Sequence, residues 1–301
     1  MNRKVRFSNS RVLVGHLGSI YSLSTLGDQL LSTGGDGNLV RWDTKAENPG
    51  YVFANVETQL YTLCVCKALI VAGSMNGAIF FIDHQTRALR SKILHHEKGV
   101  FAILSMDDRM LTGGGDGILT LWDLQNLLPI YSIRISTASI RCLTHLEGNV
   151  FCVGCSEGNL YLCEVVGETI RIVQTTAKAH SSSVFCVSYD AERQLLISGG
   201  RDAQLRIWNR SLEQIHTIAA HLFTINAIAI QPTLGLFATA SRDKTIKLWD
   251  LEQLTLLQVL EPLRDFGHFN SVNALQWIGE SLFSGSDDKR IISWQWNETN
   301  E

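Results

Sequence analysis

The sequence predicts an all-β fold in which seven four-stranded antiparallel sheets form one ring that uses the whole chain, residues 1–301. The first observation is a recurring turn and strand, typified by residues 241–250, SRDKTIKLWD. The second is its spacing, with steps of 40, 40, 41, 45, 41 and 45 residues between seven occurrences. A period in this range with a Gly/Asp-rich turn is typical of sheets packed radially as blades. The repeats end at Trp42, Ile82, Trp122, Cys163, Trp208, Trp249 and Trp294.

Each repeat is predicted to contain four short strands. In the first repeat we expect them at residues 19–24, 29–33, 39–43 and 51–54. These runs are rich in Leu, Ile, Val and Thr, which is typical of strands sandwiched between neighbouring sheets. The turn between the second and third strands contains Asp-Gly or Asn-Gly in several repeats, and such turns need a positive φ. Since proline cannot donate to a sheet ladder, we expect all four prolines between strands: Pro49, Pro129, Pro232 and Pro262.

The last repeat lacks residues for a fourth strand. It reaches Trp294 and Trp296, after which only residues 297–301 remain. Residues 11–14, just ahead of the first repeat, have the character of a fourth strand without the three that should precede it. We therefore predict that this N-terminal strand completes the last blade, closes the ring and covers the open sheet edge.

Composition favours a soluble, unsecreted protein, and we expect it in the cytoplasm. The chain has 26 Lys and Arg against 29 Asp and Glu, a net charge of -3. A surface that follows nucleic-acid phosphates would show a basic stripe, and the sequence shows none. No segment approaches the roughly 18 apolar residues of a membrane span. A nucleic-acid partner is therefore disfavoured, and no membrane partner is expected.

Seven cysteines are best explained as free thiols that act as small apolar side chains. Cys152 and Cys155 have the spacing of a zinc-binding pair, but they would flank the end of a strand. Zinc sites usually bring two close pairs together on loops. We therefore expect no metal and no cofactor.

These motifs resemble the WD-repeat β-propeller family over essentially the whole chain. The family's Gly-His opening occurs at His16 and His268, and its histidine is retained at His96, His180 and His221. The resemblance implies a seven-bladed β-propeller whose blades each hold a network of four hydrogen-bonded side chains. Matched position by position, the five networks are His16, Ser32, Asp36, Trp42; His96, Thr112, Asp116, Trp122; His180, Ser198, Asp202, Trp208; His221, Thr239, Asp243, Trp249; and His268, Ser284, Asp288, Trp294.

The second and fourth repeats depart from this pattern at almost every network position. A buried polar group without its partner costs about 1 to 3 kcal/mol, whereas replacing every partner with an apolar group can be neutral. We therefore expect these two blades to rely on packing alone. Their residues at the four positions are Val56, Ala72, Asn76 and Ile82, and Ser136 or Thr137, Val153, Glu157 and Cys163.

A His, a Ser and an Asp in one network also invite a hydrolase interpretation. Five near-copies are what a structural repeat produces, whereas an active site normally occurs once and needs an oxyanion hole beside an exposed nucleophile. The sequence contains no Gly-x-Ser-x-Gly, phosphate-loop or His-Glu-x-x-His motif. A hydrolase-like enzyme with its site at the channel mouth is one alternative. A nucleic-acid-binding propeller that stacks bases on aromatic residues is the other.

The resemblance places function on the face where the Gly-His loops and tight turns converge, here called the top face. Two series of positions point to the mouth of the central channel. The first follows the first apolar residue of each first strand: Tyr21, Tyr61, Phe101, Arg141, Phe185, Asn226 and Asn273. The second precedes the Asp of each tight turn: Gly35, Met75, Gly115, Ser156, Arg201, Arg242 and Asp287.

From these series we expect a non-catalytic scaffold that binds a protein or peptide segment. Aromatic residues and arginine dominate binding hot spots, and Gly35 and Gly115 would leave space beside the rings. The arginines favour an acidic group on the partner. The alternative is that the aromatic residues merely cap the core. The expected contact residues are Tyr21, Tyr61, Met75, Phe101, Arg141, Phe185, Arg201, Asn226 and Arg242.

One further segment stands out because the last interval of the repeat is longer. It adds residues 261–266, EPLRDF, ahead of Gly267. This segment is either a second contact loop or a tolerated insertion, and length alone does not choose between them.

Overall fold

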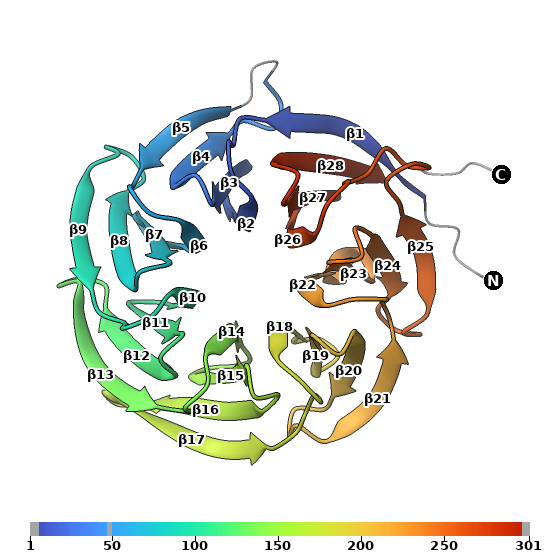
Figure 1. Ribbon diagram of the computed structural model, residues 1–301. Coiled ribbons are helices and arrows are strands. Elements are labelled where there is room, and N and C mark those ends of the chain that lie inside the picture. The colour runs from blue at the N-terminus through green and yellow to red at the C-terminus, as the bar shows by residue number, and fades with distance from the viewer. Residues whose placement is uncertain (1–5, 47–49, 297–301) are drawn as a thin grey trace.

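The computed structural model describes residues 6–46 and 50–296, which form seven four-stranded sheets arranged as the blades of a ring (Figure 1). Within each sheet the strands pair antiparallel, from one beside the central channel to one at the rim. The predicted all-β, seven-bladed propeller is thus confirmed. The innermost strands are β2 (Ile20–Leu26), β6 (Leu60–Cys66), β10 (Val100–Met106), β14 (Ile140–His145), β18 (Val184–Asp190), β22 (Ile225–Gln231) and β26 (Val272–Ile278).

The other strands continue each blade outward. The second strands are β3 (Gln29–Gly34), β7 (Leu69–Ser74), β11 (Arg109–Gly114), β15 (Val150–Cys155), β19 (Leu195–Gly200), β23 (Leu236–Ser241) and β27 (Ser281–Ser286). The third strands are β4 (Asn38–Trp42), β8 (Ala78–Asp83), β12 (Ile118–Asp123), β16 (Leu160–Val166), β20 (Gln204–Trp208), β24 (Ile246–Asp250) and β28 (Arg290–Trp296). The outermost strands are β5 (Gly50–Asn55), β9 (Leu89–Leu94), β13 (Leu128–Arg134), β17 (Thr169–Thr176), β21 (Gln214–Ala219), β25 (Leu256–Leu260) and β1 (Phe7–Val14).

The apolar core lies between neighbouring blades. One buried cluster joins Ile20, Leu30 and Trp42 of the first blade to Phe283 and Ile291 of the seventh. Burial is greatest in the second strands, which are buried almost throughout, whereas innermost strands such as β2 are partly buried and outermost strands such as β9 and β21 are largely exposed. Each sheet therefore packs both of its faces against neighbours, which explains the continuous apolar runs of the inner strands.

Proline placement departs from expectation in one case. Pro129 lies inside β13 and is paired with Trp122, whereas Pro232 begins the short 3-10 helix η1 (Pro232–Leu234). Because β13 is the outermost strand of its blade, its outer edge needs no ladder donor, and proline is tolerated there. Pro49 lies outside the described residues.

The ring is closed by β1, which pairs with β28 along seven register positions from Phe7 to Val14. The predicted closure is therefore confirmed, and the strand begins earlier than residue 11. Phe7 and Leu13 are each only 1% exposed. The Gln258 side chain also exchanges hydrogen bonds of 2.7 and 2.8 Å with the backbone of Phe7, so β1 additionally ties the sixth blade to the seventh.

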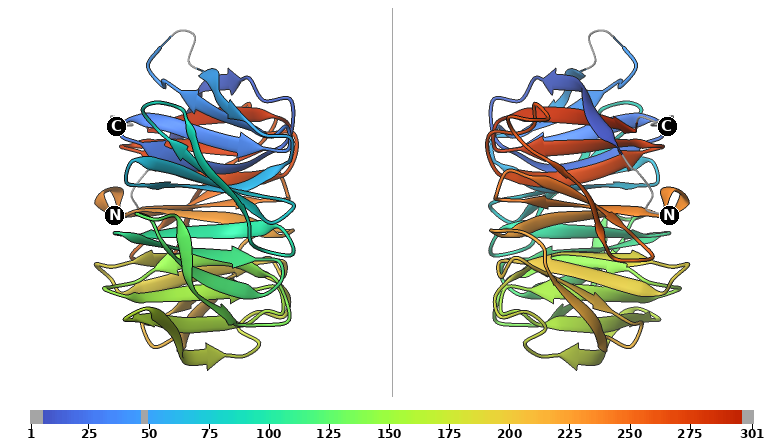
Figure 2. Two further views of the ribbon diagram at one scale, coloured as in Figure 1. Left: turned by 90° about the vertical axis from the view of Figure 1, so that its left-hand side faces the viewer. Right: turned by 90° about the vertical axis from the view of Figure 1, so that its right-hand side faces the viewer.

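The two faces of the ring differ. The tight turns between second and third strands lie on the top face, where Val14 of β1 pairs with Arg290. Phe7 of β1, Trp296 of β28 and η1 lie on the opposite, bottom face (Figure 2). The described part of the chain contains no helix of the length and apolarity that a membrane crossing requires.

Candidate functional site

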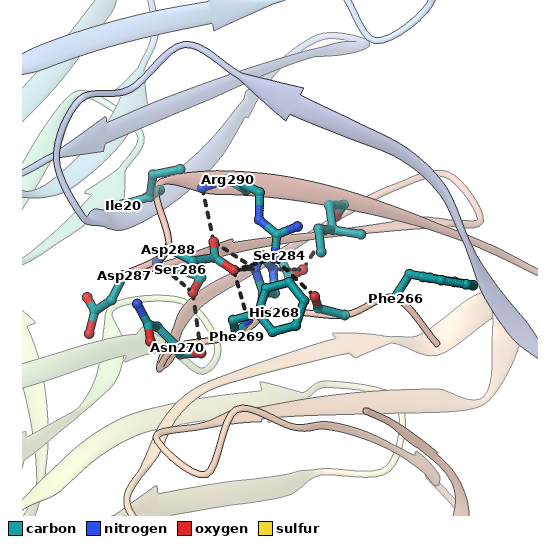
Figure 3. A network of polar contacts seen from close by, with 12 residues as sticks. Ile20, Phe266, His268, Phe269, Asn270, Ser284, Ser286, Asp287, Asp288 and Arg290 are labelled. Atoms are coloured by element: carbon teal, nitrogen blue, oxygen red, sulfur yellow. Dashed lines mark hydrogen bonds and ion pairs between the residues drawn. The ribbon is translucent and has the colours of Figure 1, made fainter. Parts of the chain in front are cut away.

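Three members of the four-residue network of the seventh blade are drawn in Figure 3, where His268 lies beside Ser284 and Asp288. The Trp294 indole N–H donates to Ser284 Oγ at 2.8 Å, Ser284 Oγ lies 2.8 Å from His268 Nε2, and His268 Nδ1 lies 3.0 Å from Asp288. The structure brings together the four matched residues in the same way in the first, third, fifth and sixth blades, with distances of 2.7 to 3.2 Å.

One protonation pattern gives every polar side-chain atom of this four-residue network a matching hydrogen-bond partner. A neutral histidine donates from Nδ1 to the carboxylate and accepts at Nε2 from the hydroxyl, whose oxygen accepts from the indole. Burial lowers the pKa of His16, His96 and His221, which favours that neutral form. Burial also opposes ionisation of Asp202, but hydrogen bonds from His180 and Arg206 outweigh it and hold the carboxyl pKa well below its usual range.

The network hydroxyls are poorly placed for nucleophilic chemistry. Ser32, Ser198 and Ser284 are 0% exposed, as are Thr112 and Thr239. Each of these oxygens also lies within hydrogen-bond distance of a tryptophan indole. A hydrolytic nucleophile must meet its substrate, so these residues do not form the exposed constellation of an acyl-transfer site.

The two divergent blades keep small polar contacts inside their turns. In the second blade Ser74 Oγ donates to Asn76 Oδ1 at 2.7 Å, while Val56 and Ile82 pack in an apolar cluster. In the fourth blade the Tyr161 hydroxyl donates to Glu157 Oε1 at 2.5 Å. Packing therefore replaces the buried network, but the fourth blade adds a turn contact that network positions alone did not predict.

A β-bulge in every innermost strand positions the first series of expected contact residues. The register between first and second strands skips one residue at the same place in all seven blades. Bulges re-aim side chains, and here they direct this series to the central channel. A cavity of about 530 Å³ is lined by Tyr21, Tyr61, Phe101, Arg141, Phe185, Asn226 and Asn273, with Ser22 and Thr62.

Five of these side chains form a continuous stack across five blades. The Tyr21 and Tyr61 rings meet edge to face at a centroid distance of 5.3 Å, and Tyr61 stacks on Phe101 at 5.3 Å. Arg141 Cζ then lies 4.1 Å from the Phe101 ring centroid and 4.6 Å from that of Phe185. The stack lines the channel and does not belong to the buried clusters between blades.

The last two members of the series are engaged inside the molecule. The Asn226 amide donates to Ser271 Oγ at 2.9 Å and to the Val272 carbonyl at 2.8 Å. The Asn273 amide donates to Asp287 at 2.7 Å and to the Ile20 carbonyl at 3.1 Å. Both asparagines thus link neighbouring blades, and the amide donor of Asn226 is less available to a partner than the sequence pattern indicates.

Glycines of the top face touch the stack directly. A Cβ at Gly115 would lie 2.9 Å from the Phe101 ring, and one at Gly35 would lie 3.5 Å from Tyr21. The space that Gly35 and Gly115 leave by lacking a side chain is therefore not free, because the Tyr21 and Phe101 rings fill it. Gly115 permits Phe101 to pack flat against the turn.

The second series surrounds the channel mouth. In each blade the backbone N–H of this residue donates to the carbonyl just before the first strand, as Arg242 does to Thr224 at 2.9 Å. Met75, Arg201 and Arg242 are exposed. Neither arginine forms an ion pair with a residue that the structure describes.

An apolar rim on the top face was found only in part by sequence reasoning, which singled out residues 261–266 but not the other members. Several large apolar side chains lie in the loops that lead to the first strands of the first, sixth and seventh blades. Three of them, Leu17, Leu222 and Phe269, come directly after a network histidine, and this is the sequence signal for those three. The full set is Leu17 (79% exposed), Leu222 (85%), Phe223 (59%), Leu263 (86%), Phe266 (77%) and Phe269 (53%).

Residues 261–266 form a compact turn at this rim. The Asp265 carboxylate accepts from the Glu261 backbone N–H at 2.8 Å and from Arg264 at 3.0 Å. Leu263 and Phe266 are left facing solvent. The turn is thus internally braced, with its two apolar side chains free of the core.

Cysteine geometry does not assemble a metal site. Cys152 and Cys155 are both 0% exposed but belong to different apolar clusters on opposite faces of β15. Burial raises the pKa of Cys142 and that of Cys163 to about 12. Within residues 6–46 and 50–296, no group of three or more His, Cys, Asp or Glu side chains is arranged to hold a metal ion.

A second cavity, of about 720 Å³, lies on the bottom face between the third and fourth blades. Two of its polar side chains have partners within the protein, since Arg109 donates to the Gly167 carbonyl and His145 Nε2 lies 2.7 Å from the Gly148 carbonyl. This cavity is larger than the channel cavity, but none of the expected contact residues lines it.

Comparison with known proteins agrees with this architecture. The family described as WD domain, G-beta repeat matches residues 7–43, 88–123, 171–209, 212–250 and 260–295, more than half of the chain. These five segments contain the network tryptophans of the five blades with complete networks. The chain therefore belongs to the WD-repeat family.

Individual relatives are distant and longer. The chain is 26% identical to the denticleless protein homolog of Danio rerio over 79% of this chain and 39% of that protein. It is 26% identical to human WD repeat-containing protein 37 over 61% of this chain and 36% of that protein. The WD40 β-propeller domain of Doa1 superposes with a TM-score of 0.84 at 18% identity, covering 97% of this chain and 98% of that one. The chain thus spans well under half of these curated relatives, and the structural match concerns the fold.

Proposed function

We propose that this protein is a non-catalytic scaffold that binds a protein or peptide segment on its top face around the channel mouth. The observation that carries the proposal is the stack of Tyr21, Tyr61, Phe101, Arg141 and Phe185 lining one cavity. Aromatic residues and arginine supply much of the energy of binding interfaces. Membership of a family of interaction scaffolds supports the same class of function.

Rigidity strengthens this proposal. The closed ring and the interblade bonds of Asn226 and Asn273 hold the cavity wall in place before any partner arrives. Preorganised surfaces lose less conformational entropy on binding. Exposed Arg201 and Arg242 at the mouth suit a partner segment that carries an acidic group.

The test is a triple substitution, Tyr61→Ala, Phe101→Ala and Phe185→Ala. We expect circular dichroism and the melting temperature to remain near wild type, because these rings line the channel and not the interblade core. Proteins captured from lysate by wild type should be lost by the triple variant. A matched control substitutes three exposed leucines of outermost strands, Leu89, Leu128 and Leu256, by alanine; it should retain capture.

Other outcomes discriminate among functions. Capture that persists in the triple variant at wild-type levels rules out the channel mouth as the contact surface. Binding of nucleic acid that falls steeply with salt would favour a nucleic-acid reader. A Leu263→Ser, Phe266→Ser variant with weakened capture would make residues 261–266 a second contact loop, and unchanged capture would make them a tolerated insertion.

A further inference from the structure

Arg141 occupies an unusual position in the channel wall. Its guanidinium lies between the rings of Phe101 and Phe185, at 4.1 and 4.6 Å from their centroids. Aromatic rings on both sides occupy the positions above and below the cation. Guanidinium N–H donors lie in the plane of the group, so the hydrogen-bonding edge of Arg141 is presented between the two rings.

That edge has no acceptor within residues 6–46 and 50–296. Arg141 Nε is buried without a hydrogen-bond partner, and the side chain forms no ion pair. Arg206 and Arg290 contrast with it, since they pair with Asp202 and Asp288 at 2.8 and 2.7 Å. Burial lowers the pKa of Arg141, as expected for a cation that is withdrawn from water without a carboxylate beside it.

The cavity supplies a single positive charge. Its other lining residues are aromatic, hydroxyl or amide side chains, with no lysine, histidine or second arginine. Asp287 beside this wall accepts from the Asn273 amide. A singly charged, planar acceptor matches one arginine fork, whereas a phosphate dianion would require a second cation.

We propose that Arg141 anchors a carboxylate-binding site inside the channel mouth. Phe101 and Phe185 flank the guanidinium, and Tyr21 and Tyr61 contact the apolar part of the ligand. A cavity of about 530 Å³ has the size of typical ligand pockets. The carboxylate is supplied by a peptide C-terminus or by an acidic side chain. The inference rests on the proposed function only in taking the top face as the binding face.

The experiment titrates small probes into purified protein and follows the Arg141 Nε–H resonance by nuclear magnetic resonance, assigned through bonds in the wild type. N-acetylphenylalanine presents an α-carboxylate, and the α-amide of N-acetylglutamate presents a side-chain carboxylate. N-acetylphenylalaninamide is the neutral match, and inorganic phosphate is the competing anion. We expect a saturable shift with one or both carboxylates and at least tenfold weaker binding of the amide and of phosphate. The tighter carboxylate identifies the source.

Variants test the anchor. Arg141→Met should weaken carboxylate binding at least tenfold, and Arg141→Lys should weaken it less, because it keeps the charge without the fork. Arg171→Met, on the exposed outermost strand β17 and outside the channel lining, should leave it within twofold. Equal binding of acid and amide, tighter binding of phosphate, or unchanged affinity in Arg141→Met would overturn the proposal. If the Met variant does not fold, the wild-type titration alone decides through the same acid, amide and phosphate comparison.

The two proposals can fail separately. Saturable carboxylate binding together with persistent capture by the triple variant would leave this site standing and refute the top-face scaffold. Loss of capture in the triple variant without carboxylate binding would do the reverse.

Discussion

The seven blades have similar backbones, but they differ in the side chain at the bulge of the innermost strand. The sequence pattern selected these positions from their place in the repeat, and the structure gathers them around one cavity. Periodicity did not indicate that Arg141 lies between the rings of Phe101 and Phe185, because these three residues belong to different blades and are about forty residues apart in the sequence. Nor did it reveal that Asn226 is bonded to the next blade.

Buried networks are another residue-scale feature. Removing His221 would take one hydrogen bond from the Asp243 carboxylate and one from the Thr239 hydroxyl. Val56, at the equivalent position of the second blade, makes only apolar contacts in its cluster.

We therefore expect His221→Ala to lower the free energy of unfolding by about 2 to 4 kcal/mol, since it removes one hydrogen bond to a charged group, worth about 1.5 to 3 kcal/mol, and one neutral hydrogen bond, worth about 0.5 to 1.5 kcal/mol. Val56→Ala should cost about 1 kcal/mol, from the loss of two partly buried carbon groups. Urea denaturation of both variants measures the difference. Equal costs, or a larger one for Val56→Ala, would contradict a stabilising role for the network.

At the scale of elements, the tight turn between second and third strands has the same backbone conformation in all seven blades. One residue of this turn has a positive φ in every blade: Gly37, Gly77, Gly117, Gly158, Ala203, Lys244 and Lys289. The Asp-Gly and Asn-Gly signals predicted this conformation for Gly37, Gly77 and Gly117. They did not predict a positive φ for Ala203, Lys244 and Lys289. The backbone of these non-glycine residues adopts the left-handed conformation at a cost in free energy that the surrounding sheet must offset.

Gly77 and Gly27 illustrate two different reasons why a position requires glycine: the backbone conformation and the space available for a side chain. Both have a positive φ, of 88° and 63°. A Cβ at Gly77 would overlap the carbonyl oxygen of His96, whereas one at Gly27 meets nothing within 4 Å.

We expect Gly27→Ala to cost about 1 to 2 kcal/mol, from the left-handed backbone alone. Gly77→Ala should cost about 1 to 3 kcal/mol more, because the chain must also move to relieve the overlap. Thermal or urea unfolding of the pair measures this. Similar losses in the two variants would show that contact with His96 is irrelevant.

At the scale of the whole molecule, one strand from the start of the chain holds the ring together. β1 covers the edge of β28 and buries Phe7 and Leu13. Its bonds to Gln258 reach the sixth blade. Sheet edges left open promote association between molecules, so closure serves solubility as well as stability.

Deleting residues 1–14 should lower the free energy of unfolding by about 3 to 6 kcal/mol, from the exposure of one Phe and one Leu site at about 1.5 to 3 kcal/mol each. The melting temperature should fall sharply, and light scattering should detect association. Deletion of residues 1–5, which keeps β1 intact, is the control. An unchanged melt for the longer deletion would refute closure as a source of stability.

The sequence by itself determined the fold class, the number of blades, the closing strand and which blades contain the His–Ser/Thr–Asp–Trp residues. Those features repeat locally, and local repetition is visible along a chain. Tertiary structure alone decided that Arg141 is held between Phe101 and Phe185, that Pro129 sits in an outermost strand, and that Leu222 and Leu263 face solvent on one rim. The place of Pro129 depends on where one strand lies in its blade, whereas the other two facts depend on side chains from different blades, whose separation in space is set by the curvature of the ring.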